Sequence, residues 1–250
     1  SEYAKRTAFI PSTVYFDQQQ RARGMIRDRQ QVNTTLEGML IFTHNFNNIL
    51  NVDAAVGMGR YLVNGDGVGV TYNDINDTIQ NYNIQAATGP NVIDSFKTRN
   101  EKRSQFARAS FDILDRYVIA GTLRRDGTDK FFPEKKYALF PSVSVAWKIF
   151  NEDFMKDIKW LDNLKLRFSW GQLGNNSIGD YDYLSTYASS GYAYPFAGNL
   201  NAGAVATLSN NLLKWETTTS TDAGIEFATF RNRFTVEADY YHRYTDDILY

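Results

Sequence analysis

The stretch that decides the fold is SVSVAWKIF, at residues 142–150. Its large apolar side chains are separated by small or polar ones and lie at Val143, Val145, Trp147 and Ile149. Because successive side chains of a β-strand point to opposite faces of the sheet, this alternation predicts a strand with one apolar face and one polar face.

The same period of two recurs on both sides of this stretch. It is found in LNVDAAVGM at 50–58, ARASFDI at 107–113, LKLRFSW at 164–170 and FTVEADY at 234–240. The pattern predicts about nine strands, at roughly 7–17, 33–43, 49–60, 97–113, 117–126, 137–150, 164–172, 212–229 and 233–249. Several of them reach the length of about nine to eleven residues that a tilted membrane strand needs.

The links between these strands alternate between short and long. On the short side are 44–48, 114–116 and 230–232, together with one bulkier link at 151–163. On the long side are 18–32, 61–96, 127–136 and 173–211. Outer-membrane barrels alternate in this way, with short periplasmic turns and long extracellular loops. The sequence therefore predicts an all-β fold, a transmembrane antiparallel β-barrel, whereas a soluble sandwich gives no reason for the alternation.

A barrel of this kind meets lipid with the apolar faces of its strands and water with the polar faces. We therefore expect lipid contact for a set of apolar residues on the predicted strands: Val143, Val145, Trp147, Phe168, Phe227 and Val236.

The composition fits a strand-rich protein and excludes several functions. Aromatic residues make up 15% of the chain and only five prolines occur, which favours strands. The absence of cysteine excludes disulfides and thiolate metal sites. A net charge of −1 gives no overall attraction to nucleic acid. The longest strictly apolar run is about four residues, whereas a membrane-spanning helix needs roughly twenty.

The parity of the apolar positions predicts the register of two hairpins. Residues that pair across a hairpin share a face of the sheet. If the apolar residues have odd numbers before the turn and even numbers after it, the loop must therefore contain an even number of residues. A two-residue loop at Arg231 and Asn232 would pair Phe227 with Val236 and Ile225 with Ala238. In the same way, a three-residue loop at 114–116 would pair Phe111 with Ile119 and Ile113 with Tyr117.

Several stretches resemble the SusC/RagA family of TonB-linked outer-membrane transporters. They are RRDGTDKF at 124–131, FPSVSVAW at 140–147, LKLRFSWGQLGN at 164–175, LKWETTT at 213–219 and NRFTVEADYY at 232–241. The resemblance covers roughly 106–250 and implies a barrel of twenty-two strands with a plug domain inside. Residues 1–250 would be part of that one transmembrane barrel domain, here a middle section of about nine strands. We find no match in them to the plug or to the TonB-contacting segment.

The resemblance also implies a function in the bacterial outer membrane. It is TonB-dependent import of a large nutrient, an oligosaccharide or a peptide, with a SusD/RagB-like surface lipoprotein as partner and TonB engaged through segments outside this chain. Two alternatives stay open. One is a non-transporting structural or docking barrel subunit of an outer-membrane assembly, and the other is a soluble β-rich glycan-binding module.

No enzyme motif is found in the chain. His44 and His242 lie far apart, and neither has a carboxylate or histidine at ligand spacing. GDGVG at 65–69 lacks the lysine of a phosphate-binding loop and indicates a flexible loop instead. Asp66, Asp74, Asn76 and Asp77 carry oxygen ligands of the kind calcium prefers, without a recognisable order of ligands. The sequence thus predicts no enzyme and no required cofactor, with calcium in an extracellular loop as an open alternative.

Two residue clusters are candidate contact sites in the predicted extracellular loops. Five tyrosines of the 173–211 link could bind sugar rings or peptide side chains, form a small core within the loop or meet a partner: Tyr181, Tyr183, Tyr187, Tyr192 and Tyr194. Four arginines near residue 25 form either a solvated loop or a contact with the phosphates of outer-leaflet lipopolysaccharide: Arg21, Arg23, Arg27 and Arg29. Nucleic acid is disfavoured because no aromatic residues interleave with the arginines.

The last hairpin places acidic residues on its polar face. The predicted register puts Glu226 directly opposite Glu237, with Asp239 two positions further on. Like charges directly opposite each other destabilise a sheet. We therefore expect these carboxylates in the lumen, where arginines or lysines of the plug, or water alone, would compensate them.

Overall fold

The computed structural model describes residues 2–11, 22–47, 49–75, 84–89, 91–187, 193–196, 199–202 and 205–249, with backbone alone from 187 to 207. Strands dominate these residues, and the helical elements among them are single short 3-10 turns. None of the described helices is both long and apolar enough to cross a membrane.

The strands that follow one another in the chain are also neighbours in the sheet. Nine of them hydrogen-bond in the order β1-β2-β3-β4-β5-β6-β7-β12-β13. Their bounds are β1 (Glu2–Ile10), β2 (Arg23–Phe46), β3 (Leu50–Asn73), β4 (Val92–Ile113), β5 (Tyr117–Thr128), β6 (Tyr137–Lys148), β7 (Leu161–Asn175), β12 (Glu216–Thr229) and β13 (Phe234–Asp246). This antiparallel order confirms the predicted fold class.

The link between β7 and β12 contains four short strands. They pair as two separate two-stranded sheets, β10 with β9 and β11 with β8. Their bounds are β8 (Thr186–Tyr187), β9 (Ala193–Phe196), β10 (Asn199–Ala202) and β11 (Val205–Thr207). The sequence did not predict these strands, because each is too short for its alternation to be recognised.

The chain forms two compact units that we describe separately. The first contains the described residues of 1–35 and 61–101, and the second those of 36–60 and 102–250. The second unit holds β5, β6, β7, β12 and β13 over their full lengths, so it contains most of the stretches from which the fold was predicted.

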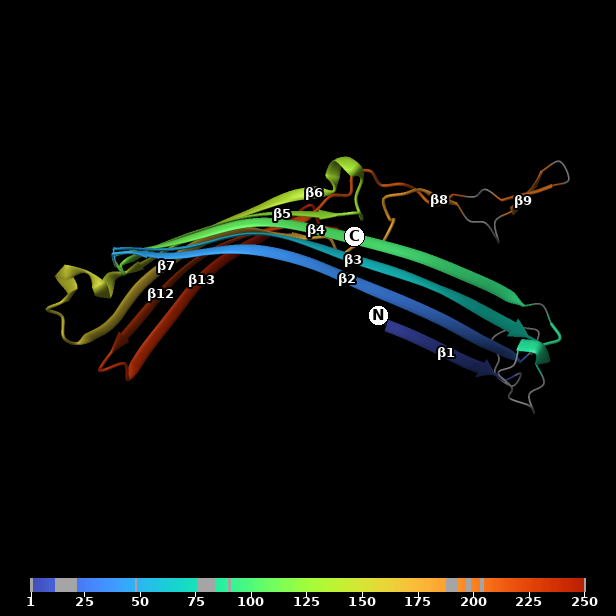
Figure 1. Ribbon diagram of the computed structural model, residues 1–250, viewed down its shortest axis with the longest axis horizontal. Helices are drawn as coiled ribbons and strands as arrows, with labels where there is room; N and C mark the ends of the chain where they lie inside the picture. The colour runs from blue at the N-terminus through green and yellow to red at the C-terminus, as the bar shows by residue number, and fades with distance from the viewer. Residues whose placement is uncertain are drawn as a thin grey trace. The chain divides into compact units, whose positions relative to one another are not determined.

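In the second unit the links of the two kinds lie at opposite ends of the strands. The turns at 114–116 and 230–233 lie at one end, with the link that contains η3 (Ile149–Asn151) and η4 (Asp153–Met155). At the other end lie η2 (Pro133–Lys135) and the link that contains β8 and β9 (Figure 1). This arrangement is the one that the alternating link lengths predicted.

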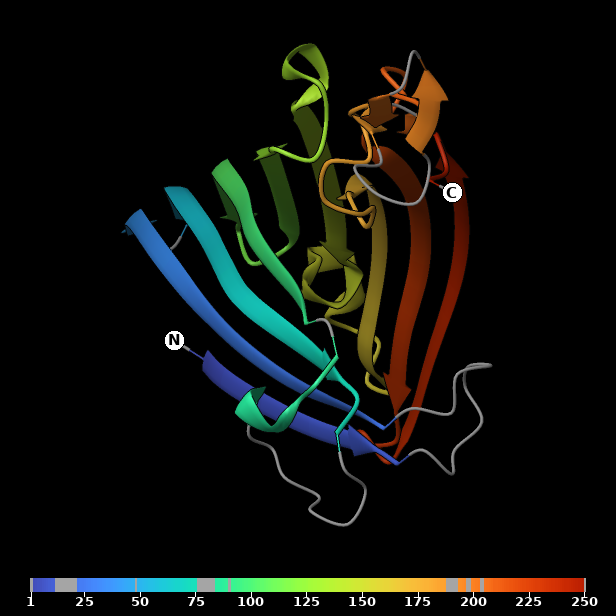
Figure 2. The same ribbon diagram turned by 90° about the vertical axis from the view of Figure 1, so that its right-hand side faces the viewer.

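The register of the second unit separates an apolar face from a polar one. Val145 of β6 pairs with Ile119 of β5 and with Phe168 of β7. One position away, Ser144 pairs with Ala120 and with Ser169. Figures 1 and 2 show β5, β6 and β7 side by side, with β12 and β13 continuing the same sheet. All six residues predicted to meet lipid lie on the apolar face by this register.

Both predicted hairpin registers are correct. Ile113 pairs with Tyr117 across the three-residue turn, and Phe227 pairs with Val236. The second turn is longer than predicted, because Thr229 and Phe234 are its last paired residues and 230–233 form a four-residue loop. The pairing survives since two and four are both even lengths.

The first unit differs most from the sequence prediction. β2 begins at Arg23, β3 continues to Asn73 and β4 begins at Val92, so most of the predicted links at 18–32 and 61–96 is strand. GDGVG at 65–69 lies inside β3 and was wrongly interpreted as a loop. Its glycines leave space for side chains of β4, since a Cβ at Gly65, Gly67 or Gly69 would overlap Thr98, Phe96 or Asp94.

A small core ties the loops of the first unit to its strands. Tyr72 is fully buried and packs with Ala22 and Ile75, with Phe9 of β1 beside them. The ring of Tyr72 covers Gly24, where any side chain would overlap it. η1 (Ile84–Ala86) joins this cluster and lies beside β1 (Figure 2). β1 begins at Glu2, earlier than predicted, and ends at Ile10, before Pro11. Residues 12–17 of the predicted strand lie outside the described residues.

Candidate functional site

A densely connected charged group lies on the polar face of the second unit. The guanidinium of Arg167, on β7, donates to Glu226 on β12 at 2.8 Å and to Asp239 on β13 at 2.8 Å. It also donates to Glu237 on β13. Lys165 adds a second cation, with its ammonium 3.2 Å from Glu226. These five residues are called the Arg167 cluster below.

A glycine allows Arg167 to reach across a whole strand. Gly224 of β12 pairs with Arg167 on one side and with Asp239 on the other. A Cβ at Gly224 would overlap both the Asp239 carboxylate and the Arg167 side chain. The absence of a side chain therefore opens the path by which β7 and β13 exchange a charge-assisted hydrogen bond over β12.

The acidic residues of the last hairpin have the predicted register. Their cationic partner in the wall, Arg167, was not predicted. Glu226 pairs directly with Glu237, and Asp239 lies on the same face. Cations of a plug, or water, were expected to compensate these carboxylates, whereas Arg167 and Lys165 of the neighbouring strand already bind them. The alternation of LKLRFSW did place both cations on the polar face, but no parity rule fixes register across the long link to β12. Within the cluster, three carboxylates against two cations leave one negative charge.

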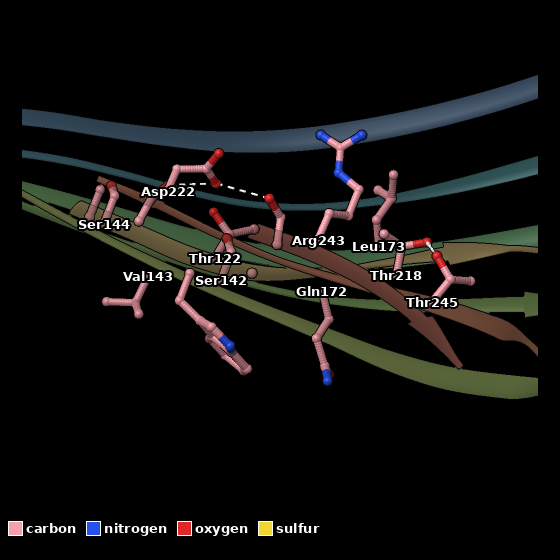
Figure 3. Close-up of a pocket in the computed structure, with 15 residues that line it drawn as sticks. Thr122, Ser142, Val143, Ser144, Gln172, Leu173, Thr218, Asp222, Arg243 and Thr245 are labelled. Atoms are coloured by element: carbon pink, nitrogen blue, oxygen red, sulfur yellow. Dashed lines mark hydrogen bonds between the residues drawn. The ribbon is translucent and has the colours of Figure 1, made fainter. Parts of the chain in front are cut away.

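Beyond the cluster the polar face is lined by hydroxyl groups. Figure 3 shows that Thr122, Ser142 and Thr245 lie on the same side as Asp222 and Arg243, whereas Val143 and Gln172 point to the opposite side. The carboxylate of Asp222 accepts a hydrogen bond from the Ser220 hydroxyl at 3.0 Å. The hydroxyls of Thr218 and Thr245 lie 2.9 Å apart and join β12 to β13. Such a face is suited to water and polar groups.

The described residues contain no arrangement suited to covalent chemistry. His44 lies inside β2, not in a turn as predicted, and its ring lies between those of Phe42 and Phe46. His242 lies in β13 beside Tyr244. No group of three or more metal-ligating side chains is found among the described residues.

The structure separates the residues that were considered for calcium. Asp66 lies within β3, and Asp74 follows the end of that strand with a positive φ of 59°. Asn76 and Asp77 lie outside the described residues.

The end with the long links is held by an aromatic cluster. Phe131 is fully buried against Trp215, and the Phe140 ring meets the same indole edge-on at 5.6 Å. The Trp215 indole donates to the carbonyl of Lys136 at 2.9 Å. Gly174 lies under the Phe140 ring and admits no side chain there. Apart from Lys136, these residues come from four of the stretches that resemble the family, at 124–131, 140–147, 164–175 and 213–219. They meet at one place and fix the bases of two loops.

Two of the five candidate tyrosines, Tyr181 and Tyr183, have described side chains. The ring of Tyr183 meets that of Phe132 edge-on at 5.2 Å, which favours a small loop core at this point. Tyr181 has a positive φ of 69° and a side chain that is 42% exposed. Tyr187 and Tyr194 belong to β8 and β9, whose side chains are not described, and Tyr192 lies outside the described residues. Their role as substrate or partner contacts stays a prediction.

The arginine cluster lies on a strand rather than in a loop. Arg23, Arg27 and Arg29 belong to β2, and Arg21 lies outside the described residues. Arg27 pairs directly with Arg6 of β1, a residue that the sequence argument missed. The guanidinium of Arg29 lies over the Phe96 ring, 5.0 Å from its centroid.

A second network lies at the end with the short links. Glu152 is 6% exposed and accepts hydrogen bonds from the Tyr117 hydroxyl, the Trp147 indole at 2.9 Å and Arg116 at 3.1 Å. These bonds, the one from Tyr117 foremost, lower the pKa of Glu152. The network joins the link after β6 to the turn between β4 and β5.

In the second unit, an antiparallel sheet with one apolar and one polar face, and with links sorted by length at its ends, defines a section of a transmembrane β-barrel wall. Residues 2–250 match the family described as "TonB dependent receptor-like, beta-barrel". The chain belongs to this family. It is therefore part of a bacterial outer-membrane protein, its apolar face meets lipid, and its polar face turns to the barrel interior.

The related proteins are consistent with this family and are much longer than the chain. The TonB-dependent receptor SusC of Bacteroides thetaiotaomicron is 39% identical over 158 residues, which are 62% of this chain and 16% of the relative. TonB-dependent receptor P39 of Formosa agariphila is 31% identical over 234 residues, 91% of this chain and 22% of the relative. The predicted resemblance to the SusC/RagA family is confirmed.

Solved structures support the fold over nearly the whole chain. The RagAB peptide transporter matches with a TM-score of 0.83 and 20% identity, covering 99% of this chain and 27% of that one. The "open-open" state of the RagAB peptide importer matches with a TM-score of 0.82 and 22% identity, over the same shares. The chain thus spans about a quarter or less of the relatives described here.

Proposed function

We propose that the chain forms part of the wall of a TonB-dependent transporter that imports a large nutrient. The observation that carries this proposal is the polar face of β5, β6, β7, β12 and β13, in a chain that belongs to the receptor family over residues 2–250. The face is lined by hydroxyls and by charges of which all but one in the Arg167 cluster are compensated within the wall. It offers a polar interior, which is suited to the passage of a hydrated nutrient.

The nutrient is an oligosaccharide or a peptide. RagAB is a peptide transporter by its structures, and SusC is a TonB-dependent receptor. The Phe132–Tyr183 pair and the neighbouring Tyr181 provide aromatic surface near the long-link end, which can stack on sugar rings or on peptide side chains.

The transporter works with two partners. A SusD/RagB-like surface lipoprotein captures the nutrient at the extracellular end, and TonB supplies energy through segments outside this chain. The RagAB complexes that match the fold support a lipoprotein partner of this kind. The aromatic cluster of Phe131, Phe140 and Trp215 keeps the loop bases in place, so that the loops can present a defined surface to such a partner.

A plug inside the barrel completes the Arg167 cluster. The cluster keeps one negative charge in excess, and an arginine or lysine of the plug would compensate it. The wall already binds its own carboxylates through Arg167. If the plug is displaced, the three carboxylates therefore remain paired with Arg167 on the wall.

The test uses the full-length gene in its own host. A deletion strain is supplied with labelled oligosaccharides and labelled peptides, and uptake is measured with and without an inactivated TonB system. We expect the deletion to abolish TonB-dependent uptake of one nutrient class and the full-length gene to restore it. Unchanged uptake of both classes, together with loss of another outer-membrane complex, would instead identify a structural or docking barrel.

A further inference from the structure

The link between β6 and β7 folds onto the lipid-facing side of the wall. Ile149, Met155 and Leu161 are buried together, and Leu164 and Phe227 pack against them. Phe227 and Leu164 pair with each other in the sheet and belong to its apolar face. The link therefore covers a part of that face at its short-link end, where the sequence predicted direct lipid contact for Phe227.

The outer surface of this link exposes large aromatic residues beside charged ones. Phe154 is 64% exposed and Trp160 is 62% exposed. The ring of Trp160 lies 6.2 Å from that of Phe227, tilted by 50°, so the indole continues the apolar face outward. The hydroxyl of Thr229 donates to the Trp160 carbonyl, which ties this position to the end of β12.

The other side of the link is fastened to the strands. Glu152 receives hydrogen bonds from Tyr117 and Trp147, whose rings stack at 6.4 Å. The link contains two lysines and three acidic residues. Lys156 lies 2.6 Å from Asp153, and Arg116 of the turn between β4 and β5 lies 3.0 Å from the same carboxylate. The link is thus a folded element with an exposed aromatic side, and its charges give no preference for anionic headgroups.

We propose that the 149–160 link is a membrane-interface anchor, with Phe154 and Trp160 inserted among the phospholipids of the periplasmic leaflet. Its occupant is lipid because the Trp160 ring lies against Phe227 of the apolar face, so the exposed aromatic side of the link adjoins the lipid-facing surface. Aromatic side chains, tryptophan in particular, are enriched at the membrane–water boundary, where the ring meets apolar chains and the N–H meets polar groups. The anchor fixes the depth of the barrel at its short-link end, and it is independent of the transported nutrient.

The test is a measurement of depth with spin labels in the full-length protein. A cysteine-free background receives Phe154→Cys or Trp160→Cys, and each variant is labelled and reconstituted in phosphatidylethanolamine/phosphatidylglycerol vesicles. The matched controls are Asp157→Cys on the same link, for water, and Val145→Cys on the apolar face, for lipid. Molecular oxygen collects in the membrane, and a soluble nickel complex stays in water.

We expect the labels at 154 and 160 to collide with oxygen several-fold more, relative to nickel, than the label at 157. Values for 154 and 160 equal to that for 157 would overturn the proposal in favour of a solvated link. Low collision rates with both reagents would overturn it in favour of a protein partner. If Trp160→Cys prevents assembly, as judged by the heat-dependent shift of the barrel on gels, the label at 154 decides alone, because Phe154 is not part of the buried cluster.

Discussion

Glu226 lies directly opposite Glu237 in the pairing of β12 with β13, and Arg167 of β7 binds both carboxylates. Two like charges in this position destabilise a sheet unless a cation compensates them. Arg167→Gln should therefore lower the temperature at which the barrel loses its heat-resistant form on gels. Adding Glu237→Gln to that variant should restore part of the loss, because it removes the repulsion. An equal effect of Arg167→Gln in both backgrounds would show that the guanidinium stabilises the wall by packing alone.

The facing of the strands makes a second prediction. Val145 lies on the apolar face between Ile119 and Phe168, and Ser144 lies on the polar face. Val145→Arg should reduce the free energy of folding in lipid vesicles by about 2–4 kcal/mol, as arginine does near the bilayer midplane. Ser144→Arg should cost much less. Equal penalties in urea-dependent folding experiments would show that the two faces are wrongly assigned.

The sequence predicts strand pairing only where two strands are joined by a short turn. Parity arguments act across short turns, so the pairs Ile113–Tyr117 and Phe227–Val236 were obtained correctly. The same rules cannot cross the long link between β7 and β12. The contact of Arg167 with Glu226, 59 residues apart, was therefore missed.

The extended strands of the first unit were missed for a different reason. Glycine and aspartate in GDGVG are poor strand formers by local preference, and the stretch was interpreted as a loop. In the structure these glycines accommodate side chains of β4, an interaction that becomes visible only when the neighbouring strand is known. Local preference gave the wrong result because packing between strands overrides it.

The network around Glu152 predicts a dependence on pH. The hydrogen bond from Tyr117, and then that from Trp147, hold the pKa of Glu152 below its ordinary value of 4.5. A carboxyl group with a lowered pKa stabilises the fold above its unfolded pKa, and this contribution is lost as the pH falls through the folded value. Resistance of the 149–160 link to proteolysis should thus decrease as the pH is lowered from about 4.5. Glu152→Gln should already be sensitive at neutral pH and should change less on acidification, and an unchanged acid response would assign the effect to other groups.

The pair of Arg6 and Arg27 favours lipopolysaccharide contact over a solvated cluster as the prediction for the arginines of β2. The two guanidinium-bearing residues are directly opposite each other in β1 and β2, and neither forms an ion pair within the described residues. An anion such as a phosphate would convert their repulsion into attraction. Arg6→Gln with Arg27→Gln should lower the amount of lipopolysaccharide that co-purifies with the full-length protein. Arg125→Gln is the matched control, because Arg125 lies over the Tyr137 ring, and an equal decrease there would exclude a specific site.

The plug contact of the Arg167 cluster gives the last prediction. Glu226→Gln with Glu237→Gln removes two of the three carboxylates and leaves Asp239 to pair with Arg167 at 2.8 Å. The wall should then assemble normally, because the repulsion between the two glutamates is removed and the Arg167 guanidinium keeps its ion pair with Asp239. A plug cation that compensates the cluster would lose its attraction.

We therefore expect a plug that is more accessible to proteases and labelling reagents in the double variant, with altered nutrient uptake and an unchanged amount of assembled barrel. Ser144→Ala is a suitable control on the same polar face, since Ser144 carries no charge. Unchanged plug accessibility and uptake would mean that water alone hydrates the remaining charge, and the carboxylates would then serve only the wall. Failure of the variant to assemble would show that the acidic residues are required to hold Arg167 and Lys165 in the sheet, because those two cations would otherwise face each other with one carboxylate between them.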